Sequence, residues 1–151
     1  MVKECGMNET IKKEAILLDY ETDSWEDAVL KAGTLLCESG LAEMEYARQM
    51  VKTVQDYGAY MVVAPGFAMP HANAEFGAKG TGISFLRLKD TVIFPNKEDN
   101  PVKVLIAVVA NNKQLHLQMF GRIAEKILDA GSREKLTVSE DIDEIYDFLN
   151  G

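Results

Sequence analysis

The chain of 151 residues is long enough to form one domain with a sizeable apolar core. Its 47% of apolar and 26% of charged residues are typical of soluble globular proteins and exclude fibrous and disordered classes. The formal net charge of -8 argues against nucleic-acid binding, which requires clustered lysine and arginine, and suits basic protein partners instead.

The cysteines and the apolar runs indicate a cytoplasmic protein. Cys5 and Cys37 give no disulfide framework, and the Cys and His residues are too scattered for a zinc site, so we expect no metal and no cofactor. The longest apolar runs, 60–65 and 104–110, are far too short to cross a bilayer, so we expect no direct membrane insertion. We expect one domain over 1–151, with residues 1–14 as an N-terminal segment that can fray.

The first half of the chain predicts one strand and two helices. Residues 15–20 are short and apolar and predict a strand. Ser24 then has the character of an N-cap, and the apolar positions that follow predict a helix ending near Gly40. Residues 43–56 repeat the helical spacing, and Gly58 closes this second helix.

The second half predicts a sheet followed by helices. Strands are predicted over 60–64, 82–88, 91–94 and 102–110, and the last is apolar almost throughout, which predicts a central strand covered on both faces. Helical patterns follow over 113–130, ending at Gly131, over 132–136, and over 139–149 with Ser139 as the cap. The sum predicts an α/β fold, a three-layer-like sandwich with a central mixed sheet of about five strands flanked by helices.

His71 follows strand 60–64 and is the stronger of two candidate functional histidines. Pro70 fixes its own φ and biases Met69 toward an extended backbone, and small neighbours such as Ala72 leave the imidazole open to another molecule. With an ordinary pKa of roughly 6.5, imidazole is largely neutral and nucleophilic near neutral pH. His71 could therefore carry a phosphoryl group, if the ring is fixed and donors surround the phosphoryl oxygens.

His116 is predicted to lie in the first turn of the helix that follows the central strand. A helix N-terminus offers unpaired N–H groups and a positive dipole, both of which favour an anion. His116 could donate to a phosphoryl group on His71, and the neighbouring Lys113 and the amides of Asn111 and Asn112 are further candidates. Ala72 and Asn73, directly after His71, complete the candidate support.

The residues alone leave a structural role open for both histidines. A lone histidine is often a hydrogen-bonded structural residue, and Pro70 could merely shape a loop. A histidine-based hydrolase is disfavoured, since no Gly-x-Ser-x-Gly element accompanies either histidine.

The run 60–72, YMVVAPGFAMPHA, resembles the phosphorylation-site signature of enzyme IIA domains of the mannitol/fructose class (type 2) of the sugar phosphotransferase system. The signature places a small residue before Ala-apolar-Pro-His-small, matched here from Gly66 to Ala72. The resemblance extends over about 16–149. APGFAMPHA, GISFLRLK and DNPVKVLIAVVA are most similar to the ascorbate-type branch.

The resemblance implies a phosphotransferase that works through a phosphohistidine. His71 would accept the group on Nε2 from the histidine phosphocarrier protein and pass it to a cysteine of enzyme IIB, with the membrane enzyme IIC as an indirect partner. The sugar would be ascorbate or a related one, and His116 would be the auxiliary histidine. We expect Phe67 and Met69 to be exposed beside the loop and to form a docking patch.

The chain departs from the family pattern at three sites. Gln55 stands where mannitol-type members carry an arginine, Asn73-Ala74 replaces the Arg-Pro common in ascorbate-type members, and Asn111-Asn112 stands where an acidic residue often precedes the second histidine. The alternative function is a regulatory module that reports its phosphorylation state to a transcriptional or nitrogen-control partner.

Overall fold

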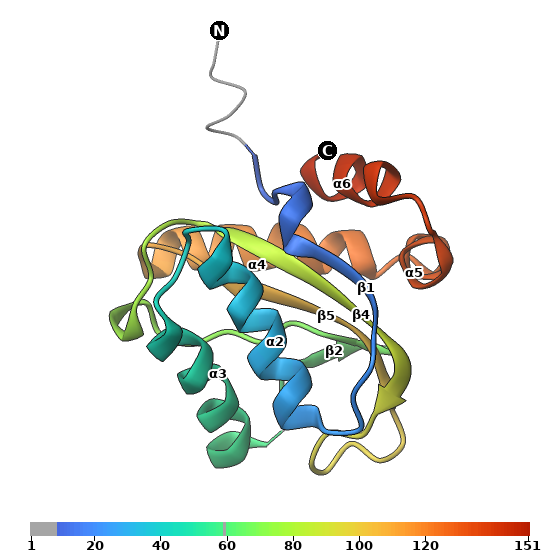
Figure 1. Ribbon diagram of the computed structural model, residues 1–151, viewed down its shortest axis with the longest axis horizontal. Helices are drawn as coiled ribbons and strands as arrows, with labels where there is room; N and C mark the ends of the chain where they lie inside the picture. Colours follow the sequence, from blue (N-terminus) through green and yellow to red (C-terminus); the bar gives the residue numbers. More distant parts are fainter. Residues whose placement is uncertain (1–8, 59) are drawn as a thin grey trace, which may run out of the picture.

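The computed structural model describes residues 9–58 and 60–151, in which a five-stranded sheet separates two layers of helices (Figure 1). The elements in chain order are η1 (Lys13–Ala15), β1 (Ile16–Tyr20), α2 (Trp25–Glu38), α3 (Met44–Tyr57), β2 (Val62–Ala64), β3 (Phe67–Ala68), η2 (Ala74–Phe76), β4 (Gly82–Val92), β5 (Val102–Val109), α4 (Lys113–Ile127), α5 (Ala130–Val138) and α6 (Ile142–Asn150).

The sheet has the order β1-β4-β5-β3-β2 and is mixed. β4 pairs with β1 in parallel and with β5 antiparallel, while β3 pairs with β5 in parallel and with β2 antiparallel. The predicted fold class, strand number and central position of β5 are therefore confirmed.

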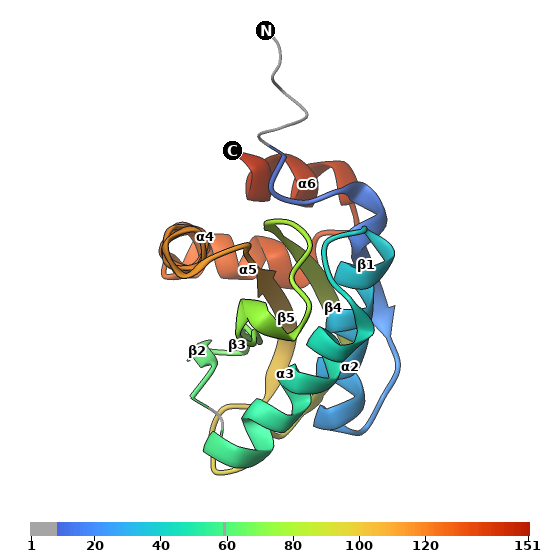
Figure 2. The same cartoon turned by 90° about the vertical axis from the view of Figure 1, so that its left-hand side faces the viewer.

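The apolar character of β5 reflects burial on both of its faces. Leu105, Ala107 and Val109 belong to the core that the sheet forms with α2 and α3. Val104 and Ile106, which alternate with them, belong to the core under α4, α5 and α6. Figure 2 shows the two helical layers on opposite sides of the strands.

Several predicted boundaries are confirmed and others are wrong. Ser24 caps α2 by accepting a hydrogen bond from the Asp27 amide, as predicted. Gly131 does not end a helix: Asp129 caps α5 there by accepting from the Ser132 amide. Asp141 rather than Ser139 caps α6, because the carboxylate of Asp141 accepts from the next helical amides.

The predicted strands 82–88 and 91–94 belong largely to the single strand β4. The register of β4 against β5 shifts between Arg87 and Val92, where Lys89, Asp90 and Thr91 are exposed. These three exposed polar residues interrupt the apolar run, which is why the sequence pattern predicted a loop between two separate strands. β3 was not predicted, because its two residues follow the turn-forming pair Pro65-Gly66.

The predicted fraying of residues 1–14 is wrong for the part of this segment that the structure describes. Ile11 is buried, and the Asn150 side chain accepts from the amides of Thr10 and Ile11 and donates to the Ile11 carbonyl. These bonds fasten the segment before β1 to the end of α6. Residues 1–8, including Cys5, lie outside the described residues.

Helices α2 and α3 pack closely enough to exclude a methyl group at Gly33. A Cβ built on Gly33 would lie 2.6 Å from the Cβ of Ala47 in α3. We predict that Gly33→Ala destabilises the protein by about 1–3 kcal/mol, because the two backbones must move apart. The free energy of unfolding by urea measures this change.

Gly121 in α4 is the matched control, since a Cβ there would meet nothing within 4 Å. Gly121→Ala should stabilise the protein by about 0.5–1 kcal/mol, because alanine costs less backbone entropy in a helix. A Gly33→Ala variant as stable as Gly121→Ala would contradict the close approach of α2 and α3.

Candidate phosphohistidine site

The parallel pairing of β3 with β5 brings the two histidines together. Parallel strands end at the same edge of a sheet, so the segments that follow β3 and β5 leave it side by side. His71 comes three residues after β3, and His116 lies in the first turn of α4 after β5. Their ring centroids are 4.8 Å apart, which confirms the predicted neighbourhood of the two imidazoles.

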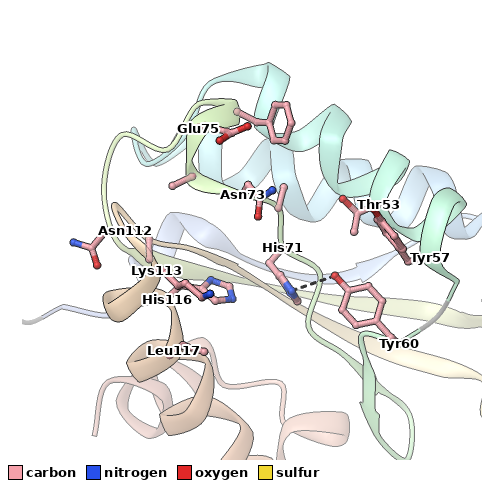
Figure 3. A pocket seen from close by; sticks show the side chains of 14 residues that line it. Thr53, Tyr57, Tyr60, His71, Asn73, Glu75, Asn112, Lys113, His116 and Leu117 are labelled. Carbon is pink, nitrogen blue, oxygen red and sulfur yellow. Dashed lines mark hydrogen bonds between the residues drawn. The ribbon is translucent and has the colours of Figure 1, made fainter.

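The His71 ring is held through both of its nitrogens. Nδ1 lies 2.9 Å from the Met69 carbonyl, and because a carbonyl only accepts, Nδ1 carries the proton. Nε2 then has a lone pair, and the Tyr60 hydroxyl donates to it across 3.4 Å (Figure 3). Phe120 packs edge-on against the same ring, with the two ring centroids 5.4 Å apart.

The N-terminus of α4 positions His116. The Asn112 side chain accepts from the Leu115 amide at 2.9 Å and so caps the helix. This cap starts the helix so that His116, in its first turn, turns its ring toward His71 in Figure 3. Phe120, one turn later, packs against both imidazoles, with ring centroids 5.4 Å from that of His71 and 5.9 Å from that of His116.

Tyr46 of α3 links the histidine loop, residues 69–73 between β3 and η2, to the central strand β5. Its buried hydroxyl accepts from the Ala72 amide at 3.1 Å and donates to the Val108 carbonyl at 2.7 Å. Burial raises the pKa of Tyr46 to about 12, so the hydroxyl keeps its proton near neutral pH. The Val108 amide donates in turn to the Pro70 carbonyl at 3.0 Å, which continues the pairing of the two segments beyond β3.

The two histidines open into a pocket of about 810 Å³. Its lining comes from α3, from Tyr60 before β2, from the segment between His71 and the end of η2, and from Ala110 and the first turns of α4 (Figure 3). Of the predicted support residues, Ala72, Asn73, Asn112 and Lys113 line this pocket. A volume of this size lies in the range of pockets that bind small molecules.

Three predicted contributions to the pocket are limited or absent. Asn111 is not among the lining residues, and its amide donates to the Thr81 hydroxyl. The Ala72 amide is occupied by Tyr46, and the Asn112 side-chain oxygen is occupied by the helix cap. From this part of the chain, Asn112, Lys113 and His116 line the pocket.

The predicted docking patch of Phe67 and Met69 is wrong. Both side chains are at most 1% exposed and belong to the core under α4. Phe67 and Met69 are two positions apart and share the face of the sheet that α4 covers, so both side chains lie in that core. The exposed apolar side chains around the pocket are instead Tyr57, Tyr60 and Leu117.

Sequence reasoning missed Tyr46, Tyr60 and Phe120 as site residues. Tyr46 and Phe120 occupy apolar positions of helices, where the sequence pattern indicates core packing only. Tyr60 lies eleven residues before His71 and reaches it because β2 and β3 form a hairpin, which the sequence did not reveal.

Burial lowers the pKa of both histidines. The pKa of His71 falls below its ordinary value of 6.5 because the ring is desolvated, and the hydrogen bond to the Met69 carbonyl opposes this only in part. The pKa of His116 falls through desolvation and through the like charge that His71 would carry. The neutral imidazoles therefore persist to a lower pH than in an exposed histidine.

We predict that both histidines titrate with midpoints below 6.5. NMR titration of the imidazole carbon-bound protons measures each midpoint. His71→Ala should raise the pKa of His116, because the substitution removes a packing neighbour and a like charge. A His116 midpoint that does not move in His71→Ala would contradict the coupling.

Within residues 9–58 and 60–151, no group of three or more His, Cys, Asp or Glu side chains is arranged to hold a metal ion. Among the helices of this same part of the chain, none has both the length and the apolar character needed to cross a membrane.

Several solved structures share this fold. A mannitol-specific cryptic phosphotransferase enzyme IIA from Escherichia coli superposes with a TM-score of 0.83 at 25% identity, over 95% of this chain and 97% of that one. The nitrogen regulatory protein IIA-Ntr from Neisseria meningitidis gives 0.80 at 25% identity, over 95% and 98%. Mannitol enzyme IIA from Escherichia coli, in complex with phosphorylated enzyme IIB, gives 0.82 at 24% identity, over 92% and 96%, and is a likeness of fold alone.

Sequence comparison points to the same group of proteins. An ascorbate-specific EIIA component of the phosphotransferase system from Salmonella choleraesuis is 29% identical over 140 residues, which are 92% of this chain and 91% of that protein. The sequence model described as "Phosphoenolpyruvate-dependent sugar phosphotransferase system, EIIA 2" matches residues 9–151, nearly the whole chain. The protein with this histidine pocket therefore belongs to the EIIA 2 family of the phosphoenolpyruvate-dependent sugar phosphotransferase system.

Proposed function

We propose that this enzyme IIA is a cytoplasmic phosphocarrier that accepts a phosphoryl group on Nε2 of His71 and passes it on during sugar uptake. The observation that carries the proposal is the orientation of the His71 ring. Nδ1 is engaged by the Met69 carbonyl inside the fold, while Nε2 is the nitrogen that the pocket residue Tyr60 reaches. A fixed ring with one available lone pair is what nucleophilic transfer requires.

The transfer step balances without a further reagent. The Nε2 lone pair attacks the phosphorus of a phosphohistidine on the histidine phosphocarrier protein, and the new N–P bond forms as the donor's N–P bond breaks. The electron pair of the broken bond returns to the donor imidazole. His71 keeps its Nδ1 proton, so positive charge develops on its ring, and the Met69 carbonyl stabilises that charge.

The surroundings of Nε2 favour a bound dianion. His116 lies beside His71 at the N-terminus of α4, where the helix dipole and Lys113 add positive potential. The phosphoryl charge on His71 would raise the pKa of His116 and so favour its protonated, doubly donating form. His116 is then an auxiliary donor to the phosphoryl oxygens, and Asn73 lies within the same pocket.

The onward acceptor in this proposal is a cysteine of enzyme IIB. Mannitol enzyme IIA, which shares the fold, forms a complex with phosphorylated enzyme IIB. On this chain the pocket rim carries Tyr57 and Leu117, which are 75% and 61% exposed and offer an apolar contact to a partner. The net charge of -8 favours partners with a basic docking face.

Ascorbate or a related sugar is the proposed substrate of the complete transport system, in which the membrane enzyme IIC takes part. The support is the 29% identity with the ascorbate-specific EIIA component, which extends over nearly all of both chains. Ascorbate uptake by membrane vesicles reconstituted with the cognate enzymes IIB and IIC tests this assignment. Uptake of a different sugar through the same chain would contradict it.

A regulatory role is the second candidate, and the likeness to the nitrogen regulatory protein IIA-Ntr favours it. In that role the phosphorylation state of His71 would control binding to a transcriptional or nitrogen-control partner. Transfer to a IIB cysteine separates the two functions: a phosphorylated chain that transfers to its IIB is a carrier, whereas one that binds a regulator and transfers to no IIB is a sensor.

We predict that His71→Ala abolishes phosphorylation by phosphoenolpyruvate, enzyme I and the histidine phosphocarrier protein. The acid-labile phosphate that forms on the unsubstituted chain would have no acceptor nitrogen in the variant. Intact-mass spectrometry at alkaline pH measures the added phosphoryl group. Labelling of the variant to the same extent as the unsubstituted chain would show that the acceptor is a residue other than His71.

We predict that His116→Ala is still labelled but transfers its phosphoryl group to enzyme IIB about 100–1,000-fold more slowly, the range for losing one positioned donor. The reason is that the alanine leaves the transferring oxygens without the imidazole donor. Rapid-quench kinetics of transfer measures the rate. An unchanged rate would leave His116 with a packing role only.

A further inference from the structure

The Tyr60 hydroxyl is the polar group that contacts the reacting nitrogen of His71. It lies 3.4 Å from Nε2, and the two rings meet edge to face with centroids 5.7 Å apart. Since Nδ1 carries the ring proton, Nε2 accepts and the tyrosine hydroxyl donates. Tyr60 therefore has its proton directed toward the atom on which the phosphoryl group would be formed.

Tyr60 and His116 approach His71 from different parts of the fold. Tyr60 precedes β2, whereas His116 projects from α4, and Figure 3 shows the His71 imidazole between these two side chains. A phosphoryl group on Nε2 would present three oxygens. His116, the donor from α4, can bond to those on its own side, and the oxygens on the β2 side need a different hydrogen-bond donor. Tyr60 is positioned on that side.

The hydroxyl of Tyr60 has to change its acceptor when the group arrives. Formation of the N–P bond uses the Nε2 lone pair, so the hydrogen bond from Tyr60 to nitrogen ends at that moment. The phosphoryl oxygens then lie next to the position of the hydroxyl and accept the same proton. Tyr60 can make this small displacement because its side chain is 52% exposed and lies outside the regular part of β2.

The proton of Tyr60 stays on its oxygen throughout. Partial burial raises the pKa of this phenol above its ordinary value of 10.0, so the group is a donor near neutral pH. During transfer the bond between the donor and the phosphorus breaks, the electron pair of that bond stays on the donor, and the N–P bond to His71 forms. Tyr60 contributes a hydrogen bond whose acceptor changes from a neutral imidazole nitrogen to a negatively charged phosphoryl oxygen. A hydrogen bond to a charged acceptor is the stronger of the two.

On these grounds we propose that Tyr60 is a catalytic residue of phosphoryl transfer, donating first to Nε2 of His71 and then to the phosphoryl group. This inference rests on the proposed function, since it assumes that Nε2 of His71 is the acceptor. It assigns to the residue before β2 a role that acts directly on the reacting atoms.

The test compares Tyr60→Phe with the unsubstituted chain in phosphorylation by phosphoramidate. This small donor loses ammonia as its P–N bond breaks and needs no protein docking, so a slower reaction cannot come from a lost partner contact. Phenylalanine keeps the ring that packs beside His71. We expect the saturating rate of His71 labelling to fall about 10-fold, the lower end for loss of one hydrogen bond to a charged group.

NMR titration supplies a second measurement on the same variant. A donor to Nε2 stabilises the neutral imidazole, so its removal should raise the pKa of His71 in Tyr60→Phe. Tyr146→Phe is the matched control, because it removes a tyrosine hydroxyl that bonds to Glu9 outside the pocket. The control should retain both the labelling rate and the His71 midpoint of the unsubstituted chain.

The outcomes separate the two claims. If the unsubstituted chain gains no phosphoryl group on His71, the proposed function fails. If the unsubstituted chain is labelled and Tyr60→Phe is labelled equally fast, or has an unshifted His71 midpoint, the role of Tyr60 is overturned while the function stands. A slower rate together with a raised midpoint, with Tyr146→Phe unaffected, supports the role.

Discussion

The site depends on the parallel alignment of the two-residue strand β3 with the central strand β5. Only Phe67 and Ala68 pair with Val104 and Leu105, and the hydrogen bond from the Val108 amide to the Pro70 carbonyl extends the contact. This short ladder fixes the exits of both strands at one edge of the sheet. His71 and His116, separated by 45 positions in the chain, lie beside each other because of it.

Burial of the neighbouring residues gives the ladder its rigidity. Phe67 and Met69 point into the core under α4, so the segment that carries His71 is anchored by apolar packing on that side. The same burial that removes them from a docking surface keeps the imidazole in one orientation. Tyr57 and Leu117 remain exposed at the rim, where apolar area is accessible to a second protein.

The sequence predicted what local pattern and composition determine. The Ser24 cap, the helical spacing of α2 and α3, and the uniform apolarity of β5 were read from consecutive residues, and each is confirmed. The order β1-β4-β5-β3-β2 and the strand β3 required long-range pairing that no local pattern encodes. His71 was recognised from its Pro-His context. Tyr46 and Tyr60 were missed because their roles arise only when α3 and the β2–β3 hairpin meet the loop.

The hydroxyl of Tyr46 gives the histidine loop an unusual mechanical property. Loops ordinarily fluctuate independently of the strands they connect. Here the Ala72 amide donates to the buried phenol that itself donates to the Val108 carbonyl, and the Val108 amide donates to the Pro70 carbonyl. Outward movement of the loop therefore breaks one hydrogen bond to α3 and one to the middle strand of the sheet. Opening of the loop costs these hydrogen bonds, so the imidazole is carried on a segment that resists local opening.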